Sequence, residues 1–457
     1  MSTSYDVRVW KTETVPGARG NRFKVRWAVA GRRWKQSFRS AALADSFRSE
    51  LVAAARKGEP FDTDTGRPAT TQPVPTTSWY EFACSYVDMK WPDAAGKSRM
   101  GIAETLATVT PALLSEWRGR PSDGAMRAAL YGWAFNTRAR NVNDPPAELA
   151  GAIRWLEMHT VQVAELAKPQ LVRAVLARIS SKLDGTPAAA TTVGRKRAVF
   201  HNVLEYAVER GLLSQNPLAA VKTKKARTVE VVDKRVVANP EQATRLLDGV
   251  RQQGRTGRHL VVFFGLMYYS ALRPAEAAAL SKGDLVIPSE GWGELYLPKS
   301  APTTGAAWAD SGKRRDRRGL KHRPREEVRP VPCPPPLTEL LQAHLAEFGT
   351  AADGRLVRGV WSDDLSDSTY GRVWQKARAA ALTPEEVASP LARRPYDLRH
   401  AAVSTWLNGG VPAIQVAEWA GHSVAVLLRV YVKCIAGQAD MARDKISRAL
   451  GLKGGLC

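Results

Sequence analysis

One apolar segment in the C-terminal half constrains the fold more than any other feature of the sequence. Residues 260–272 form the longest apolar run of the chain, about 13 residues. A membrane-spanning helix needs about 20 such residues, so this run is too short to cross a bilayer. A helix that is apolar all round must be surrounded by other elements. We therefore expect a buried helix at the centre of a globular domain, and no membrane role.

The residues around this segment predict a mixed domain over residues 238–457. Asn239, Pro240 and Glu241 predict a helix start, because Asn caps helices well and Pro suits the first helical position. Strands are expected at residues 293–298 and 327–333, separated by a long basic loop, residues 300–326. Further helices are expected at residues 337–348, 369–381, 397–407, 412–420 and 424–434.

Residues 78–220 predict a helical domain. Apolar residues recur there at helical spacing in residues 106–117, 125–135, 147–158, 171–183 and 191–211. Residues 221–237 follow without periodicity, and we interpret them as a basic linker.

The first 60 residues predict a small sheet backed by a helix. Residues 22–29 alternate basic with apolar side chains, which is typical of a half-buried strand with one charged face. A turn at residues 31–33, a second strand at 34–38 and a helix at 40–56 follow. Residues 61–77 are rich in Thr and Pro and are interpreted as a linker. The predicted fold class is therefore mainly α with small β-sheets (α+β).

The charge of the chain favours a polyanionic partner. There are 67 Lys and Arg against 44 Asp and Glu, a net charge of +23. Basic residues that neutralise phosphates release counterions, so nucleic acid is the expected partner. The candidate DNA-binding residues are Arg22, Lys24, Arg26, Arg32, Arg33, Lys222, Lys224 and Lys225.

The four cysteines lie far apart, without the spacing of a disulfide framework or of a cysteine-rich zinc site. No apolar signal segment opens the chain. We expect a cytoplasmic protein without metal or cofactor.

Three C-terminal segments carry candidate chemistry. Arg273 follows the apolar helix, and Glu276 lies three residues further on. Asp397 is expected as an N-cap, which places Arg399 in the first turn of a helix, where anions bind well. Gly421 is expected to close a helix just before His422. Taken singly, an ion pair, a surface helix start and a structural histidine explain these segments as well.

The order and spacing of these segments resemble the tyrosine recombinase (phage integrase) family over roughly residues 239–435. The matching boxes are L-R-x-x-E at Arg273, D-L-R-H at Arg399, G-H-S at His422 and R-x-Y at Tyr431. The amino-acid sequence around the second and third boxes is similar to that in integrases of actinobacterial mobile elements. The N-terminal unit and the helical domain are similar to that family's arm-binding and core-binding domains.

The resemblance implies that Tyr431 attacks a DNA phosphodiester and forms a 3′-phosphotyrosyl bond. It implies that Arg273 and Arg399 stabilise the charge on the phosphate oxygens, with His422 as a further donor or proton-transfer group. Glu276 is expected to orient Arg273. Each step exchanges one phosphoester for another, so neither ATP nor a metal ion is required.

The family supplies a lysine as the general acid from a loop between two strands. We favour Lys321, which lies ten positions before Val331, over Lys299 at the end of the preceding strand. The loop is long and basic, so Lys313 stays open as well.

The chain departs from the family pattern at Tyr396, where a histidine is usual. A phenol can donate to a phosphate oxygen, but its pKa near 10 makes it a poor base at neutral pH. Either Tyr396 provides only the hydrogen bond that a histidine would donate at this position, or His400 compensates for the missing histidine. A packing role of His400 remains the alternative.

The predicted function is that of an integrase that inserts or excises a mobile element. The expected partners are double-stranded attachment sites, three further copies of the chain in a homotetramer on DNA, and an excisionase-type directionality factor. A DNA-binding regulator is the first alternative, because residues 398–422 resemble a helix-turn-helix motif. A type IB topoisomerase, which shares the chemistry, is the second.

Overall fold

The computed structural model describes residues 3–16, 21–69, 77–142, 144–222, 231–320, 327–359 and 364–432, with residues 434, 443, 446, 447, 449 and 450. The chain divides into two compact units; the N-terminal sheet belongs to the first, and most of the helical segment and the C-terminal segment belong to the second. Over these residues, no helix combines the length and apolarity needed to span a membrane. The predicted fold class, mainly helical with small sheets, is confirmed.

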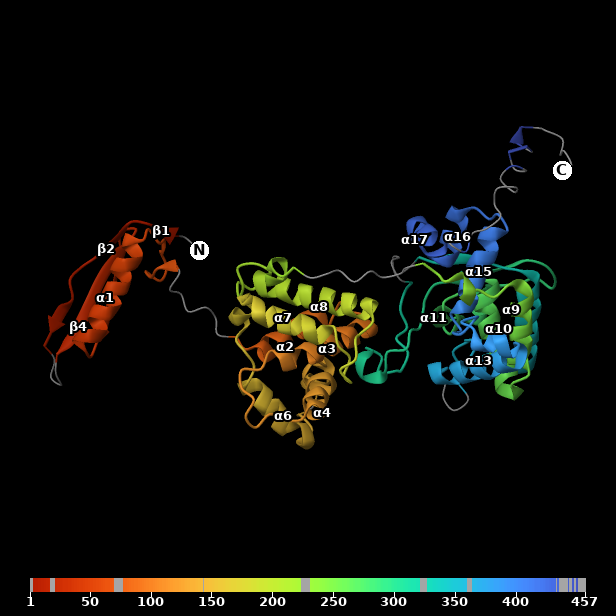
Figure 1. Cartoon of the computed structure of the whole chain (residues 1–457), viewed down its shortest axis with the longest axis horizontal. Helices are drawn as coiled ribbons and strands as arrows, with labels where there is room; N and C mark the ends of the chain where they lie inside the picture. The colour runs from red at the N-terminus through yellow and green to blue at the C-terminus, as the bar shows by residue number, and fades with distance from the viewer. Residues whose placement is uncertain are drawn as a thin grey trace. The chain divides into compact units, whose positions relative to one another are not determined.

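The N-terminal unit is a sheet with one helix along one face (Figure 1). Strand β4 (Arg22–Val29) pairs antiparallel with β2 (Val7–Val9), β3 (Glu13–Val15) and β5 (Arg32–Phe38). Its alternation buries Val25, Trp27 and Val29 in a core that includes residues of α1 (Ala41–Arg56). The other face of β4 carries Arg22, Lys24 and Arg26, as the alternation predicts.

Two details of this unit differ from the sequence expectations. Ala30 and Gly31, with φ of 51° and 78°, form the hairpin turn, so Arg32 and Arg33 already belong to β5. Arg32 therefore pairs with Val29 and stacks over Trp34 at 4.6 Å, on the face opposite to Lys24.

The expected linker at residues 61–77 begins with folded residues. Strand β6 (Phe61–Asp62) pairs with β1 (Thr3–Ser4), and Phe61 is fully buried. The aromatic ring of Phe61 belongs to the N-terminal core, which explains why this part of a polar, proline-rich segment is ordered.

The middle segment is helical. Its elements are α2 (Trp79–Lys90), α3 (Gly96–Val109), α4 (Asp123–Arg127), the π-helix η3 (Ala128–Ala134), α5 (Thr137–Val142), α6 (Ala147–Met158), α7 (Pro169–Ile179) and α8 (Ala190–Glu209). The helix expected at residues 106–117 was wrong in its bounds, because α3 starts at Gly96 and ends at Val109. Pro111, within the 3-10 turn η2 (Thr110–Ala112), has no N–H to continue the helical ladder.

The C-terminal segment surrounds the predicted buried helix. Helix α10 (Gly254–Tyr269) is the centre of this core, and the apolar run is buried from Leu260 to Tyr268. Helices α9 (Pro240–Arg251), α11 (Pro274–Ala277), α12 (Pro335–Phe348), α13 (Asp367–Ala381) and α15 (Asp397–Asn408) pack against it. The segment also contains α14 (Pro384–Ala388), and α16 (Ala413–Ala420) and α17 (Val424–Tyr431), whose buried residues form a second core cluster. Asn239 caps α9 as predicted, and its side chain accepts from the Gln242 amide. The order in the small sheet is β7 (Leu285–Val286), β8 (Gly293–Leu297) and β9 (Arg329–Cys333).

The long loop between β8 and β9 packs against the helical segment. Trp308 lies against the rings of Trp91 and Tyr131, with centroids at 5.8 and 5.1 Å. Arg99, which is 5% exposed, donates to both carboxylate oxygens of Asp310, at 2.6 and 3.2 Å. These contacts with one buried arginine and one aromatic cluster hold the basic loop in a defined conformation.

Gly249 allows α9 and α13 to approach closely. A Cβ at this position would lie 2.8 Å from the carbonyl oxygen of Ala377 and 2.9 Å from the Cβ of Ala381. We predict that Gly249→Ala lowers the free energy of unfolding by roughly 1–3 kcal/mol, because backbone must shift to admit the methyl group. The control Gly371→Ala adds a methyl group on α13 in open space and should stabilise by about 0.5–1 kcal/mol. Urea unfolding of both variants measures the difference; equal midpoints would contradict the close approach.

Candidate active site

The cluster starts where the buried helix ends. Helix α10 stops at Ser270, and Ala271 has a φ of 51°, which turns the chain toward α11. Arg273 then caps α11. Its Nη1 donates to Glu276 at 2.8 Å, its backbone N–H donates to the other oxygen of Glu276 at 2.8 Å, and its Nη2 donates to the carbonyl of Gly421 at 2.7 Å. The predicted contact between Arg273 and Glu276 is thus present in the structure.

A second arginine holds the same carboxylate, and sequence reasoning missed it. Arg329, the first residue of β9, is 1% exposed and donates through Nη2 to Glu276 at 2.8 Å. Burial alone would raise the pKa of Glu276, but Arg329 and Arg273 outweigh it and lower this pKa to about 2. The available sequence signal was an arginine in register with the buried residues Val331 and Cys333 on the apolar face of a strand.

Arg399 is fully buried in the first turn of α15. It donates to the carbonyls of Ala271 and Ala420, and its Nη2 lies 2.9 Å from Nε2 of His422. Burial, followed by the charge of Arg273, lowers the pKa of Arg399. The guanidinium group therefore joins the ends of α10 and α16.

The predicted cap of α15 was wrong. Tyr396, without a side-chain bond to the helix, stands at the N-cap, and Asp397 is the first helical residue. The carboxylate of Asp397 accepts instead from the backbone N–H and from Nη2 of Arg394, at 2.8 and 3.1 Å. This local loop satisfies Asp397 before the helix begins, which is why it does not cap.

The protonation of His422 follows from its partner. Burial, then Arg399 and Arg273, lower the pKa of His422 to about 3, so the ring is neutral at neutral pH. A guanidinium group only donates, so Nε2 must accept and the ring proton resides on Nδ1. Among the described residues this buried Nδ1 has no hydrogen-bond partner. His422 thus offers one free N–H donor beside Arg399.

Gly421 closes α16 as predicted and does so with a left-handed backbone, φ 63° and ψ 50°. It also lies against two guanidinium groups. A Cβ would stand 3.2 Å from Nη1 of Arg273 and would collide with Arg329. Two requirements, backbone conformation and space, therefore select glycine here.

Tyr431 ends α17 and is 1% exposed. Its hydroxyl lies 2.9 Å from Nδ1 of His400, and its ring centroid lies 6.2 Å from that of His422. Burial strongly raises the pKa of Tyr431. Tyr396 packs edge-on against His400 at 5.1 Å.

Arg273 keeps its charge in this setting. Burial acts against that charge, but Glu276 and then Tyr396 outweigh it and raise the pKa of Arg273.

All predicted site residues of the four boxes meet in one cluster, together with Tyr396, His400 and the unpredicted Arg329.

For the predicted lysines the structure gives only their exposure, where it describes them. Lys321, Lys224 and Lys225 lie outside the described residues. Lys299, Lys313 and Lys222 are exposed.

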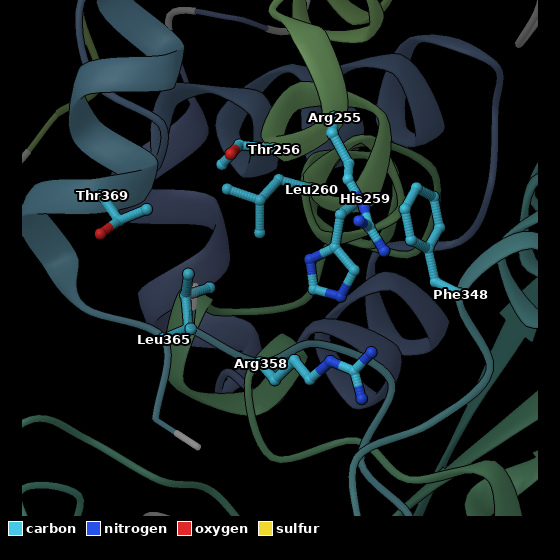
Figure 2. Close-up of a pocket in the computed structure, with 9 residues that line it drawn as sticks. Arg255, Thr256, His259, Leu260, Phe348, Arg358, Leu365 and Thr369 are labelled. Atoms are coloured by element: carbon cyan, nitrogen blue, oxygen red, sulfur yellow. The ribbon is translucent and has the colours of Figure 1, made fainter. Parts of the chain in front are cut away.

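A cavity of about 290 Å³ elsewhere in the C-terminal segment is not part of the cluster. It is lined by residues of α10, α12 and α13 and of the chain before α13, and Figure 2 shows Arg255, His259 and Arg358 along one side of it. No residue of the cluster lines it. The residues that could carry out chemistry are therefore those of the cluster. There, three guanidinium groups and one neutral histidine lie near a single carboxylate. Such a group of fixed donors suits a phosphate.

We predict that Gly421→Ala disrupts this arrangement. The added methyl group displaces Arg329 and Arg273, so the free energy of unfolding should fall by more than the roughly 1 kcal/mol that a left-handed alanine costs. Gly254→Ala is the matched control, since Gly254 has a φ of 64° with no atom near its Cβ position. Thermal unfolding of the two variants compares the costs, and an equal loss would show that the guanidinium groups need no room at Gly421.

The chain is similar to known proteins in sequence and in fold. The chain is 27% identical over 259 residues to the tyrosine recombinase XerC of Mycobacterium bovis and, equally, of Mycobacterium tuberculosis, covering 54% of this chain and 74% of each relative. The fold is similar to that of the Tn1549 transposon integrase in complex with transposon right-end DNA, with a TM-score of 0.52 and 13% identity over 82% of this chain and all of that one. No family model matches the sequence. The four boxes, the similarity to XerC and the shared fold all point to the tyrosine recombinases as the proteins that this chain resembles.

Proposed function

We propose that this chain is an integrase-type site-specific recombinase that cleaves and rejoins DNA through a phosphotyrosine bond at Tyr431. The observation that carries the proposal is the convergence of Arg273, Arg399, His422 and Tyr431 from four separate elements. A structural ion pair accounts for Arg273 alone. It does not account for a second arginine and a histidine with a free donor beside a tyrosine.

Each side chain has a distinct part in the proposed reaction. Arg273 and Arg399 donate to the non-bridging oxygens, on which negative charge grows in the transition state. The Nδ1–H of His422 supplies a further donor. Glu276 and Arg329 hold Arg273 in place.

The leaving 5′-oxygen needs a proton, and we assign this to a lysine of the loop between β8 and β9. Lys321 remains the first candidate because it lies closest in sequence to β9, with Lys299 at the end of β8 as the rival. The ε-ammonium group of either residue can deliver the proton from a flexible stem.

The proposed substrates are double-stranded attachment sites at the ends of a mobile element, bound by four copies of the chain. The Tn1549 integrase was solved on transposon right-end DNA, and XerC is a tyrosine recombinase. The basic face of β4 would bind separate arm sites, and an excisionase-type factor would set the direction. This N-terminal unit favours a recombinase over a type IB topoisomerase, which has no use for distant arm sites. The buried arginines beside Tyr431 likewise favour an enzyme over a regulator.

We predict that Tyr431→Phe abolishes covalent attachment to DNA while DNA binding persists. The probe is a set of nicked duplexes tiled over the DNA that flanks the gene for this chain, in which the nick lets the cut fragment diffuse away. Denaturing gels measure the adduct, and gel shifts measure binding. Tyr370→Phe, a substitution on α13, is the control and should leave adduct formation intact. An adduct that persists in Tyr431→Phe would refute the nucleophile, and no adduct of the native chain on any duplex would refute the function.

We predict that a 5′-bridging sulfur rescues Lys321→Ala. A thiolate leaves without a proton, so loss of the general acid should slow cleavage of the oxygen substrate by roughly 10²–10⁴-fold and cleavage of the sulfur substrate little. Single-turnover rates on both substrates measure the effect. Rescue of Lys299→Ala, with no effect of Lys321→Ala, would move the role to Lys299.

A further inference from the structure

The hydroxyl of Tyr431 has a nitrogen base as its neighbour. Nδ1 of His400 lies 2.9 Å from this oxygen, and the two rings lie 5.6 Å apart, tilted by 59°. His400 lies one turn into α15, directly after Arg399, so the helix that positions the buried guanidinium also positions this imidazole. The contact joins α15 to the last residue of α17.

We propose that His400 is the general base that removes the proton of Tyr431 during attack, in place of the histidine that the family usually has at the position of Tyr396. The inference rests on the proposed function, in which Tyr431 is the nucleophile. The inference names the group that accepts the proton of the Tyr431 hydroxyl.

The other groups around Tyr431 are poorly suited to this task. Nε2 of His422 accepts from Arg399, and its Nδ1 already bears the proton, so this ring is a donor in the free chain. Tyr396 carries a phenol, which is a poorer proton acceptor than an imidazole ring. Nδ1 of His400, in contrast, lies within hydrogen-bond distance of the Tyr431 hydroxyl.

The charges that face His400 keep it neutral and ready to accept. Burial, then Arg399 and Arg394, lower the pKa of His400 to about 4. The remaining titratable groups near the ring are Tyr396, Tyr431 and His422. At pH 6 to 8 the free chain therefore holds an unprotonated base against a protonated phenol, whose own pKa burial raises.

The step balances in protons and bonds. The phenolic oxygen of Tyr431 forms a bond to phosphorus while its proton passes to Nδ1 of His400. The bond from phosphorus to the 5′-oxygen breaks, and the general acid of the loop protonates that oxygen. In the rejoining step the deprotonated group of the loop takes the proton of the incoming 5′-hydroxyl, whose oxygen bonds to phosphorus. The bond from phosphorus to the phenolic oxygen breaks, and His400 returns the proton to that oxygen.

The decisive variant is His400→Asn in the full chain. The amide oxygen of Asn reproduces the position of Nδ1 and still accepts a hydrogen bond, but it cannot take a proton. A role in holding Tyr431 would survive this change, whereas a role as a base would not. The probe is the nicked duplex that traps the native chain, and the measurement is the single-turnover rate of adduct formation from pH 6 to pH 9.

We expect a native rate that is nearly constant from pH 6 to 8, because His400 stays neutral there. His400→Asn should be slower by roughly 10²–10⁴-fold at pH 7. Its rate should rise about tenfold per pH unit, because cleavage then depends on the small fraction of free phenolate. A rate within about threefold of the native one, with the same pH profile, would overturn the proposal and leave Tyr431 as the nucleophile.

Two rescues separate chemistry from misfolding. A fluorinated tyrosine placed at position 431 has a more acidic phenol and should restore most of the rate of His400→Asn. Added imidazole should restore cleavage by His400→Ala. Failure of both rescues would overturn the proposal, whereas a native chain that forms no adduct on any duplex would overturn the proposed function itself.

Discussion

One buried carboxylate allows the active-site cluster to exist. Glu276 accepts from Arg273 and from Arg329, and its charge also acts on Arg399. Three guanidinium groups could not be buried together without it, since a buried charge that loses its partner costs about 3–5 kcal/mol. One carboxylate neutralises only part of this charge, and both histidines are neutral. The cluster therefore keeps a surplus of positive charge, carried by guanidinium groups that the surrounding contacts hold in place.

The rest of the cluster depends on two helix ends that turn with positive φ. Ala271, with φ 51°, ends α10, and Gly421, with φ 63°, ends α16. Each turn exposes carbonyl groups, and Arg399 bonds to Ala271 and Ala420 while Arg273 bonds to Gly421. The arginines thus satisfy the ends of both helices and fix their own side chains in the same contacts. The same hydrogen bonds therefore end both helices and position the two guanidinium groups.

The sequence predicted the members of this cluster that belong to recognisable boxes, and it missed those that depend on tertiary context. Arg273, Arg399, His422 and Tyr431 could be found because their spacing resembles a family. Arg329 could not, because a single arginine in a short strand has many explanations until the fold brings Glu276 beside it.

The wrong predictions of local structure also depend on contacts that the local sequence does not reveal. Asp397 was predicted as an N-cap, but its carboxylate accepts from Arg394 instead. The turn was predicted at residues 31–33, but it includes Ala30, which adopts a backbone conformation unusual for alanine. In contrast, the buried helix and the capped start of α9 were predicted, since both depend on residues adjacent in sequence.

The free donors of the cluster indicate where an anion would bind. Within the described residues, Nε of Arg399, Nε of Arg329 and Nδ1 of His422 are buried without a hydrogen-bond partner. Each such group costs roughly 1–3 kcal/mol relative to a satisfied one, so natural structures retain them for a reason. The side chain of Arg273 is 26% exposed, whereas Arg399 and Tyr431 are almost fully buried. Arg273 is therefore the guanidinium group of the cluster that is most accessible to solvent. Because the unsatisfied donors are buried, an anion would reach them only after a local rearrangement of the side chains that cover them.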